Sequence, residues 1–121
     1  MKLEIYDCTL REGEQASGVS FNSQDVLEMC SISDELGFDY IELGWPVVSK
    51  EIFDCFRPAI ERVKNAEIVA FGSTARSSDY ENDKNLNSIV DCGVRYACIF
   101  GKADISHVEN QLRISGEENF E

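Results

Sequence analysis

A fourfold alternation of short apolar stretches and segments with helical spacing constrains the fold of this chain more than any other feature. Each apolar stretch is rich in Ile, Val, Tyr or Phe and is bounded by Gly, Pro, Ser or Asp, a pattern typical of strands. The expected strands span residues 2–10, 38–46, 66–74 and 96–104. Because the unit recurs about every 30 residues, it indicates parallel strands joined by right-handed helical crossovers.

The first expected helix covers residues 22–37. Asn22 or Ser23 can cap its start, and Gly37 can close it. Apolar residues recur along it with a helical period, which predicts one buried face. That face would consist of Val26, Leu27, Cys30, Ile32 and Leu36.

Three further helices are expected. The second covers residues 49–65, and Pro58 should break or kink it near its middle. The third covers residues 80–93, and the fourth begins near Ser106 and runs to the last residue. Their expected buried residues are Ile52, Phe53, Phe56, Ile60 and Val63 in the second helix, and Leu86, Ile89 and Val90 in the third.

The chain is therefore expected to be an α/β protein built from four parallel βα units. Its 121 residues suit one small domain. Four such units can form an open sheet, and they are also half of a (β/α)₈ barrel, the TIM barrel. We interpret residues 1–121 as the N-terminal half of a TIM barrel, containing strands one to four and truncated before a fifth strand.

Charge and cysteine content exclude several classes of partner. The formal net charge of -12 would repel nucleic-acid phosphates and anionic membranes, so neither partner is expected. Five cysteines at wide spacing, without a C-x-x-C motif, are typical of reduced thiols. No apolar run approaches the length that crosses a bilayer, which is about 20 residues. We expect a cytoplasmic protein.

The functional groups of parallel α/β proteins gather where strands end and helices begin. The expected strand ends carry Arg11, Glu12, Glu42, Arg76 and Lys102. Glu42 differs from the others because Ile41 and Leu43 flank it, and strand alternation turns its side chain to the opposite face. A buried carboxylate needs a partner. Arg11, one strand away, is the expected partner.

The stretch DCTLREGEQ, residues 7–15, resembles the first-strand signature of the DRE-TIM metallolyases, the alpha-isopropylmalate synthase family. In that signature, D-x-T-L-R-[DE]-G-x-Q ends strand one of a TIM barrel. The stretches DYIELGWP, IVAFGSTAR, IFGK and EEN resemble the (R)-citramalate synthase branch. That branch usually has Asp where Glu12 stands. Homocitrate synthases present a histidine near the end of strand three, where this sequence has Ser73 and Thr74.

The resemblance implies a pyruvate-carboxyltransferase-type domain and a metal-dependent Claisen condensation of acetyl-CoA with pyruvate. Homocitrate and 2-isopropylmalate synthases remain alternatives, with other 2-keto acids as substrates. A lyase that cleaves a CoA thioester, as some members of the family do, is a further alternative.

The resemblance also implies roles for individual residues. Arg11 and Glu42 would be catalytic, with Arg11 facing the oxygen on which negative charge develops. Glu12 would be one ligand of a divalent metal, Mg, Mn or Zn. The substrate would contact Asp7, Gln15, Thr74 and Arg76.

The metal site implied by the resemblance is incomplete in this chain. The family's H-x-H ligands are missing, and the single histidine, His107, lies after the fourth strand. Whether the chain alone is an enzyme is therefore left open, and we expect it to be inactive alone. It would need a C-terminal barrel half or self-association. A non-catalytic half-barrel that binds a partner or itself is the alternative.

Overall fold

The computed structural model describes residues 1–75 and 79–120. Four parallel strands form one open sheet in the order β1-β2-β3-β4. The strands are β1 Tyr6–Asp7, β2 Tyr40–Gly44, β3 Glu67–Ser73 and β4 Tyr96–Phe100. Each strand pairs with its neighbour in the sequence. The expected α/β class is confirmed, and the arrangement is consistent with half of a TIM barrel whose sheet is not closed.

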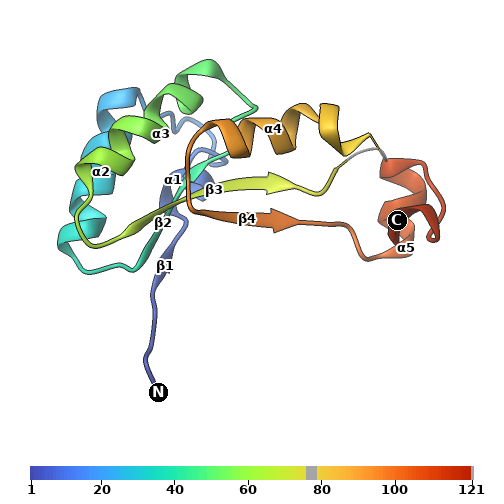
Figure 1. The fold of residues 1–121 in the computed structure, drawn as a ribbon, viewed down its shortest axis with the longest axis horizontal. Coiled ribbons are helices and arrows are strands. Elements are labelled where there is room, and N and C mark those ends of the chain that lie inside the picture. The colour runs from blue at the N-terminus through green and yellow to red at the C-terminus, as the bar shows by residue number, and fades with distance from the viewer. Residues whose placement is uncertain (76–78, 121) are drawn as a thin grey trace.

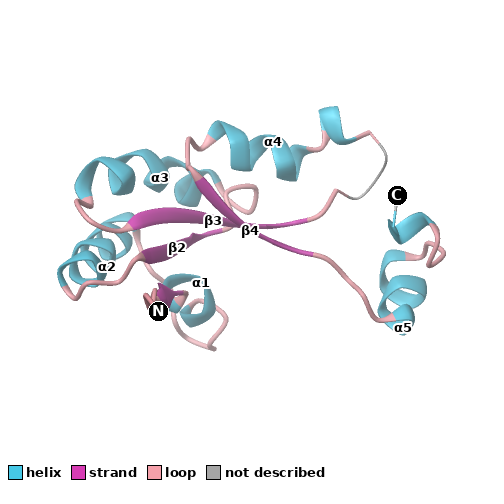
Figure 2. Ribbon diagram, turned by 60° about the horizontal axis from the view of Figure 1, so that its bottom comes forward, coloured by secondary structure: helices cyan, strands magenta, loops and turns pink. Residues whose placement is uncertain are grey.

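Three helices cover one face of the sheet (Figure 1). They are α2 Ser23–Glu35, α3 Lys50–Arg62 and α4 Lys84–Asp91, while the short α1 Thr9–Gly13 follows β1 directly. Each of the three begins at a polar residue of the kind that caps helices. Asn22 forms a capping box with Asp25, as expected for the first helix, and the side chains of Ser49 and Asp83 cap the next two. A second view shows the same helices lying along the strands (Figure 2).

The second helix was expected to break or kink at Pro58, and it does not break there. Helix α3 runs through Pro58 as one element. Phe56 and Ala59 lie on either side of the proline and are fully buried. Their packing against the sheet holds both halves of the helix, although the proline supplies no N–H to it.

The segment after β4 is not the single long helix that was expected. It consists of the short α5 Ile105–His107, the π-helical turn η2 Val108–Leu112 and the 3-10 turn η3 Glu118–Phe120. Arg113 ends η2 in the left-handed conformation, with φ 61°. The Asn119 side chain donates a hydrogen bond to the carbonyl of Lys102, so the chain folds back here instead of continuing as a helix.

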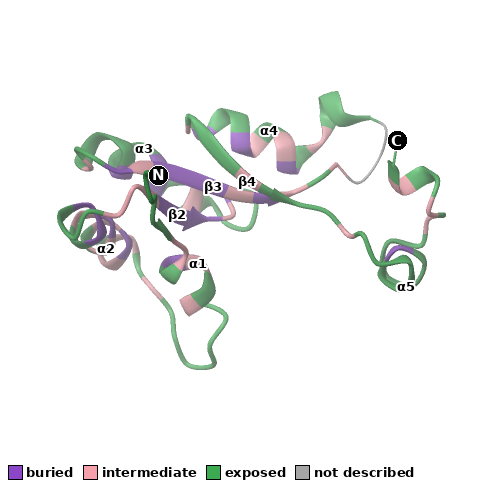
Figure 3. Ribbon diagram, turned by 90° about the horizontal axis from the view of Figure 1, so that it is seen from below, coloured by how far each residue is buried: buried purple, intermediate pink, exposed green. Residues whose placement is uncertain are grey.

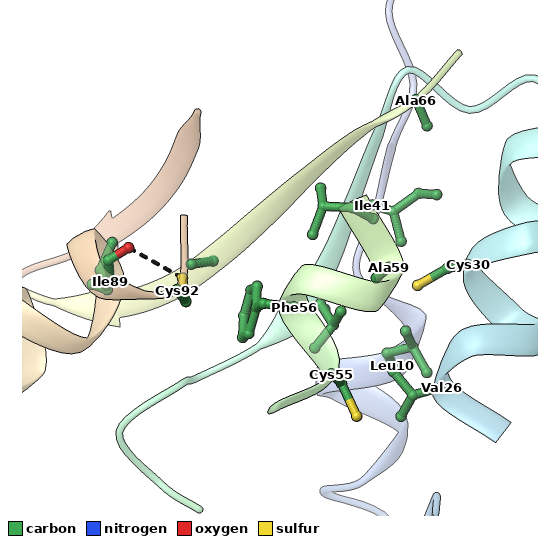
Figure 4. Packing of buried hydrophobic residues seen from close by; sticks show 13 residues of the cluster. Leu10, Val26, Cys30, Ile41, Cys55, Phe56, Ala59, Ala66, Ile89 and Cys92 are labelled. Carbon is green, nitrogen blue, oxygen red and sulfur yellow. Dashed lines mark hydrogen bonds between the residues drawn. The ribbon is translucent and has the colours of Figure 1, made fainter. Parts of the chain in front are cut away.

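The main core lies between the sheet and helices α2, α3 and α4 (Figure 4). It includes Ile41 and Ile68 from the strands and Phe56 from α3. Because alternate strand residues point to opposite faces, this arrangement leaves Tyr6, Tyr40, Glu42, Val69 and Phe71 on the other side of the sheet.

Helices α2, α3 and α4 each carry both buried and exposed residues (Figure 3). All three expected helix faces differ in part from the structure, and in the second helix Ile60 is exposed. Ile32 and Leu36 of the first helix segment are exposed, and Ser33 and Asp34 are buried instead. The Asp34 carboxylate accepts hydrogen bonds from the backbone N–H groups of residues 64, 65 and 66, which compensates for its burial. In the third helix, Val90 is exposed and a polar residue, Asn85, is buried.

The opposite face of the sheet carries exposed aromatic rings. Tyr6 and Tyr96 are 43% and 41% exposed, and the Tyr40 ring lies between them, with ring centroids 6.2 and 5.4 Å away. Helices α2, α3 and α4 do not cover this side of the sheet (Figure 1). Among the described residues, no helix has the length and apolar composition that a membrane span requires.

Candidate functional site

A pocket of about 390 Å³ lies at the carboxyl ends of the strands, where parallel α/β proteins place their functional groups. Its polar side consists of Arg11, Glu14 and Gln15, which all follow β1. The rest of the wall comes from the ends of β2, β3 and β4, the loop between β2 and α3, and the start of α3. These lining residues are Gly44, Trp45, Val48, Ile52, Phe71 and Phe100. The pocket is thus polar at one side and mainly apolar at the other.

Glu42 lies beside this pocket, near the end of β2, and is 1% exposed. Its carboxylate accepts hydrogen bonds from Nε of Arg11 and from the hydroxyl of Tyr6, the latter at 2.6 Å. The expected pairing of Glu42 with Arg11 is confirmed. Tyr6 was not identified from the sequence, although strand pairing and alternation place it on the same face of the sheet as Glu42.

Arg11 is held from three directions. Besides Glu42, its Nη1 contacts a carboxylate oxygen of Glu12 at 2.8 Å. Its guanidinium carbon lies 4.1 Å from the ring centroid of Phe71, a cation–π contact. Burial alone would lower the pKa of Arg11, but the hydrogen bonds and charges of Glu42 and Glu12 raise it. Arg11 therefore presents a fixed cation at the pocket, with N–H groups suited to an oxyanion.

The hydroxyl of Tyr6 is kept protonated. Partial burial raises the pKa of Tyr6, and the hydrogen bond to Glu42 raises it further. Tyr6 therefore acts as a neutral donor that satisfies the buried carboxylate. Together, Tyr6 and Arg11 provide partners for both oxygens of Glu42.

Three aromatic rings form the apolar wall of the pocket. Trp45 meets Phe71 and Phe100 edge to face, with ring centroids 5.7 and 6.0 Å away. The two phenylalanine rings stack on each other at 5.4 Å. Such geometries are favourable for aromatic pairs. Sequence reasoning did not identify this cluster, although Trp45 lies in the quoted DYIELGWP stretch.

The other predicted site residues lie in different surroundings. Gln15 lines the pocket. Asp7 accepts hydrogen bonds from the backbone and hydroxyl of Thr9 and from the hydroxyl of Ser33, so its carboxylate joins the start of α1 to α2. The backbone N–H of Thr74 donates to the carbonyl of Phe100 at 3.0 Å, which ties the ends of β3 and β4 together. Arg76 lies outside the described residues.

A complete metal centre is not formed by the described residues. Glu12 is exposed and offers carboxylate oxygens, but one of them pairs with Arg11. Within residues 1–75 and 79–120, no three His, Cys, Asp or Glu side chains are grouped so that they could hold a metal ion. Glu12 is therefore a candidate for one ligand of a site that the described residues do not complete.

Comparisons with known proteins place this geometry in a family. The (R)-citramalate synthase of Sulfolobus acidocaldarius is 39% identical over an alignment of 121 positions, which covers 98% of this chain and 23% of that protein. The homocitrate synthase AksA of Methanopyrus kandleri is 37% identical over 97% of this chain and 28% of its own length. The 2-isopropylmalate synthase of Listeria innocua is 28% identical over 97% of this chain and 22% of its own length.

The chain thus spans about a quarter of the length of the curated relatives it matches. The family model described as HMGL-like matches residues 2–121, which include all four strands and every residue of the pocket. The resemblance inferred from the DCTLREGEQ stretch is confirmed at the level of the family. With this match, four parallel βα units and a site at their carboxyl ends, the chain belongs to the HMGL-like (DRE-TIM) family.

Proposed function

We propose that this chain carries the 2-keto acid site of an acyltransferase that condenses acetyl-CoA with pyruvate, as an (R)-citramalate synthase does. The observation that carries the proposal is the fixed Arg11 at the polar side of a small, mainly apolar pocket. A 2-keto acid has a carboxylate and carbonyl at one end and a short apolar group at the other. That distribution matches the two sides of the pocket.

In the proposed reaction, a carbon–carbon bond forms between the methyl carbon of acetyl-CoA and the carbonyl carbon of pyruvate. The methyl group loses a proton, and the carbonyl oxygen becomes an alkoxide that is then protonated. Hydrolysis of the thioester releases CoA. Arg11 would donate N–H groups to the developing alkoxide, a type of contact worth about 3 to 4 kcal/mol in other enzymes. Glu42 and Tyr6 would keep Arg11 oriented.

The remaining residues have supporting roles in the proposal. Gln15 lines the pocket and would contact the substrate. Thr74, which directly follows β3, and Arg76, which lies outside the described residues, are further proposed substrate contacts. Asp7 would act indirectly, by holding α1 in place, since Thr9 and Ser33 already engage its carboxylate. Glu12 would supply one oxygen ligand to a divalent ion, which supplies Lewis-acid polarisation of the carbonyl when bound. The ion's other ligands would come from another part of a complete enzyme.

We further propose that residues 1–121 correspond to the first four strands of a barrel. A C-terminal half, or a second copy of the chain, would cover the exposed face that carries Tyr6, Tyr40 and Tyr96. This would also pair the open edges at β1 and β4. The five free cysteines favour a reducing compartment, so a cytoplasmic location is part of the proposal.

A second candidate is a non-catalytic half-barrel that assembles with itself or a partner. The exposed aromatic face favours it, because large exposed apolar patches mark interaction sites. Homocitrate or 2-isopropylmalate synthesis is a further alternative within the family. The absence of a histidine at Ser73 and Thr74 favours a short keto acid over a longer dicarboxylic one.

Substrate choice tests the proposal. This chain would be mixed with a separately produced C-terminal part of an (R)-citramalate synthase, and CoA release from acetyl-CoA would be measured with pyruvate, 3-methyl-2-oxobutanoate or 2-oxoglutarate. The proposal expects release with pyruvate above the other two. Preference for 2-oxoglutarate would favour the homocitrate alternative. A stable complex without release from any keto acid would favour the assembly module.

A further inference from the structure

One buried amide joins the ends of β2 and β3 to helix α4. Asn85 lies in the first turn of α4 and is 8% exposed. Its Oδ1 accepts a hydrogen bond from the indole Nε1–H of Trp45 at 2.5 Å. Its Nδ2 donates to the backbone carbonyl of Ser73 at 2.6 Å. Both polar groups of the amide are therefore used inside the protein.

A glycine in β3 leaves the space that this position of Asn85 requires. Gly72 lies in β3 opposite α4, and a Cβ atom there would lie 2.4 Å from Cδ1 of Ile89 and 3.0 Å from Oδ1 of Asn85. Any larger residue at 72 would push α4 away from the strand. The close approach of helix and strand thus brings the Asn85 amide within reach of Trp45 and Ser73.

Trp45 connects Asn85 to the pocket. Its ring lies edge to face against Phe71 and Phe100, and Phe71 in turn contacts the guanidinium of Arg11. The indole is only partly covered by its surroundings and borders the pocket directly. Its Nε1–H bond to Asn85 therefore fixes where the apolar wall stands relative to Arg11.

We propose that Asn85 is a positioning residue that holds Trp45 as the apolar wall of the pocket and thereby limits the size of the group that the pocket admits. The size limit rests on the proposed function, because it takes the ligand to be a 2-keto acid whose carbonyl oxygen meets Arg11 and whose side chain meets Trp45. Asn85 itself does not line the pocket. It acts through the tryptophan.

The unmodified chain provides the first test, because Trp45 is its single tryptophan. One indole N–H signal is expected in a ¹⁵N-correlated NMR spectrum. A hydrogen bond to a buried amide should slow hydrogen exchange of that N–H by about tenfold or more relative to N-acetyltryptophanamide. Exchange at the rate of the free compound, with the backbone amides of β3 protected, would overturn the proposal.

A pair of variants provides the second test. Asn85→Leu removes both hydrogen bonds, whereas Asn87→Leu makes the same change on the exposed side of α4. In Asn85→Leu, acrylamide quenching of Trp45 fluorescence should rise by about twofold, with little change in Asn87→Leu. Far-UV circular dichroism checks the fold of both. Equal quenching in two folded variants would contradict the proposal. If Asn85→Leu does not fold, the exchange measurement decides.

Ligand size provides the third test, with pyruvate and the longer, branched 3-methyl-2-oxobutanoate as probes of Trp45 fluorescence. The unmodified chain should prefer pyruvate, and Asn85→Leu should reduce that preference by about tenfold. An unchanged preference would overturn the size limit and leave the proposed function intact. If neither probe binds even to the complex with a C-terminal part of an (R)-citramalate synthase, while the indole N–H is protected, the proposed function and its size limit are overturned and the positioning of Trp45 stays supported.

Discussion

Nε of Arg11 donates a hydrogen bond to Oε1 of Glu42, a carboxylate that is 1% exposed. The contact joins α1 to β2. This one contact holds the Arg11 cation at the pocket and also compensates for the burial of the Glu42 carboxylate. The structure therefore links the stability of the sheet to the position of the charged group that we propose for the reaction.

Replacing Arg11 with Leu should lower the free energy of unfolding by about 3 kcal/mol, because Glu42 would lose its charged partner inside the protein. Urea unfolding followed by Trp45 fluorescence measures the change. Arg57→Leu is the matched control, since Arg57 forms an exposed pair with Glu61, and such pairs contribute little. Equal effects of the two substitutions would contradict the view that the Arg11–Glu42 pair is structurally important.

Tyr6→Phe should lower the free energy of unfolding by about 1 to 3 kcal/mol, because one oxygen of Glu42 would lose its donor. Tyr80→Phe is the control, as Tyr80 is 60% exposed. Urea unfolding compares the two. A loss in Tyr6→Phe no larger than that in Tyr80→Phe would show that the hydroxyl contributes nothing through Glu42.

The raised pKa of Tyr6 predicts that the stability of the fold decreases at alkaline pH. The folded chain holds the phenolic proton more tightly than the unfolded chain, so the stabilisation is complete below the pKa of an unfolded tyrosine, about 10. It is lost as pH rises from there towards the folded value. Unfolding free energies between pH 9 and 11 should therefore fall more steeply in the unmodified chain than in Tyr6→Phe. Parallel curves would contradict this assignment.

The lowered pKa of Asp34 predicts that the stability of the fold decreases at acidic pH. Burial would raise its pKa, but hydrogen bonds from the backbone N–H groups of Ala66, Lys64 and Asn65 lower it below the ordinary value. The stabilisation is therefore present above the unfolded pKa and is lost as pH falls through the folded one. Thermal unfolding from pH 6 to pH 3 should show this loss, and Asp34→Asn should reduce it. Asp91→Asn, at an exposed position, should keep the loss. A similar acid profile in all three proteins would contradict the assignment.

The five thiols should differ in reactivity at pH 8. Burial raises the pKa of Cys30 to about 12 and also raises that of Cys92. Because the thiolate is the reactive form, both should alkylate slowly. Cys8 and Cys98 are less buried and should react first. Mass spectrometry after a short iodoacetamide pulse checks the order, and denatured protein is the control. Rapid labelling of Cys30 in the folded chain would contradict the described core.

The sequence predicted the features that depend on local periodicity. Strand alternation was enough to identify Glu42 as turned away from its apolar neighbours and to name Arg11 as its partner. The start of α2 was predicted from Asn22, because capping depends on residues within one turn. The family followed from a stretch of nine residues, 7–15.

Features that depend on the approach of distant segments were not predicted. Asn85 reaches Trp45 because Gly72 lets α4 come close to β3, and no local pattern indicates that approach. Ile32 was assigned to the core by helical spacing, but Asp34 is bonded to the turn that precedes β3, and with Asp34 facing inward Ile32 is exposed. Pro58 was expected to break or kink α3, and burial of Phe56 and Ala59 on either side of the proline keeps the helix unbroken.

CoA release in a reconstituted mixture tests the central claim most directly. This chain, or its Arg11→Ala variant, would be combined with a separately produced C-terminal part of an (R)-citramalate synthase, acetyl-CoA and pyruvate, with complex formation measured by size-exclusion chromatography. The account predicts CoA release with the unmodified chain and a loss of at least about a hundredfold in a complex that contains Arg11→Ala. Equal release from both complexes, or a stable complex of the unmodified chain that releases no CoA, would contradict it.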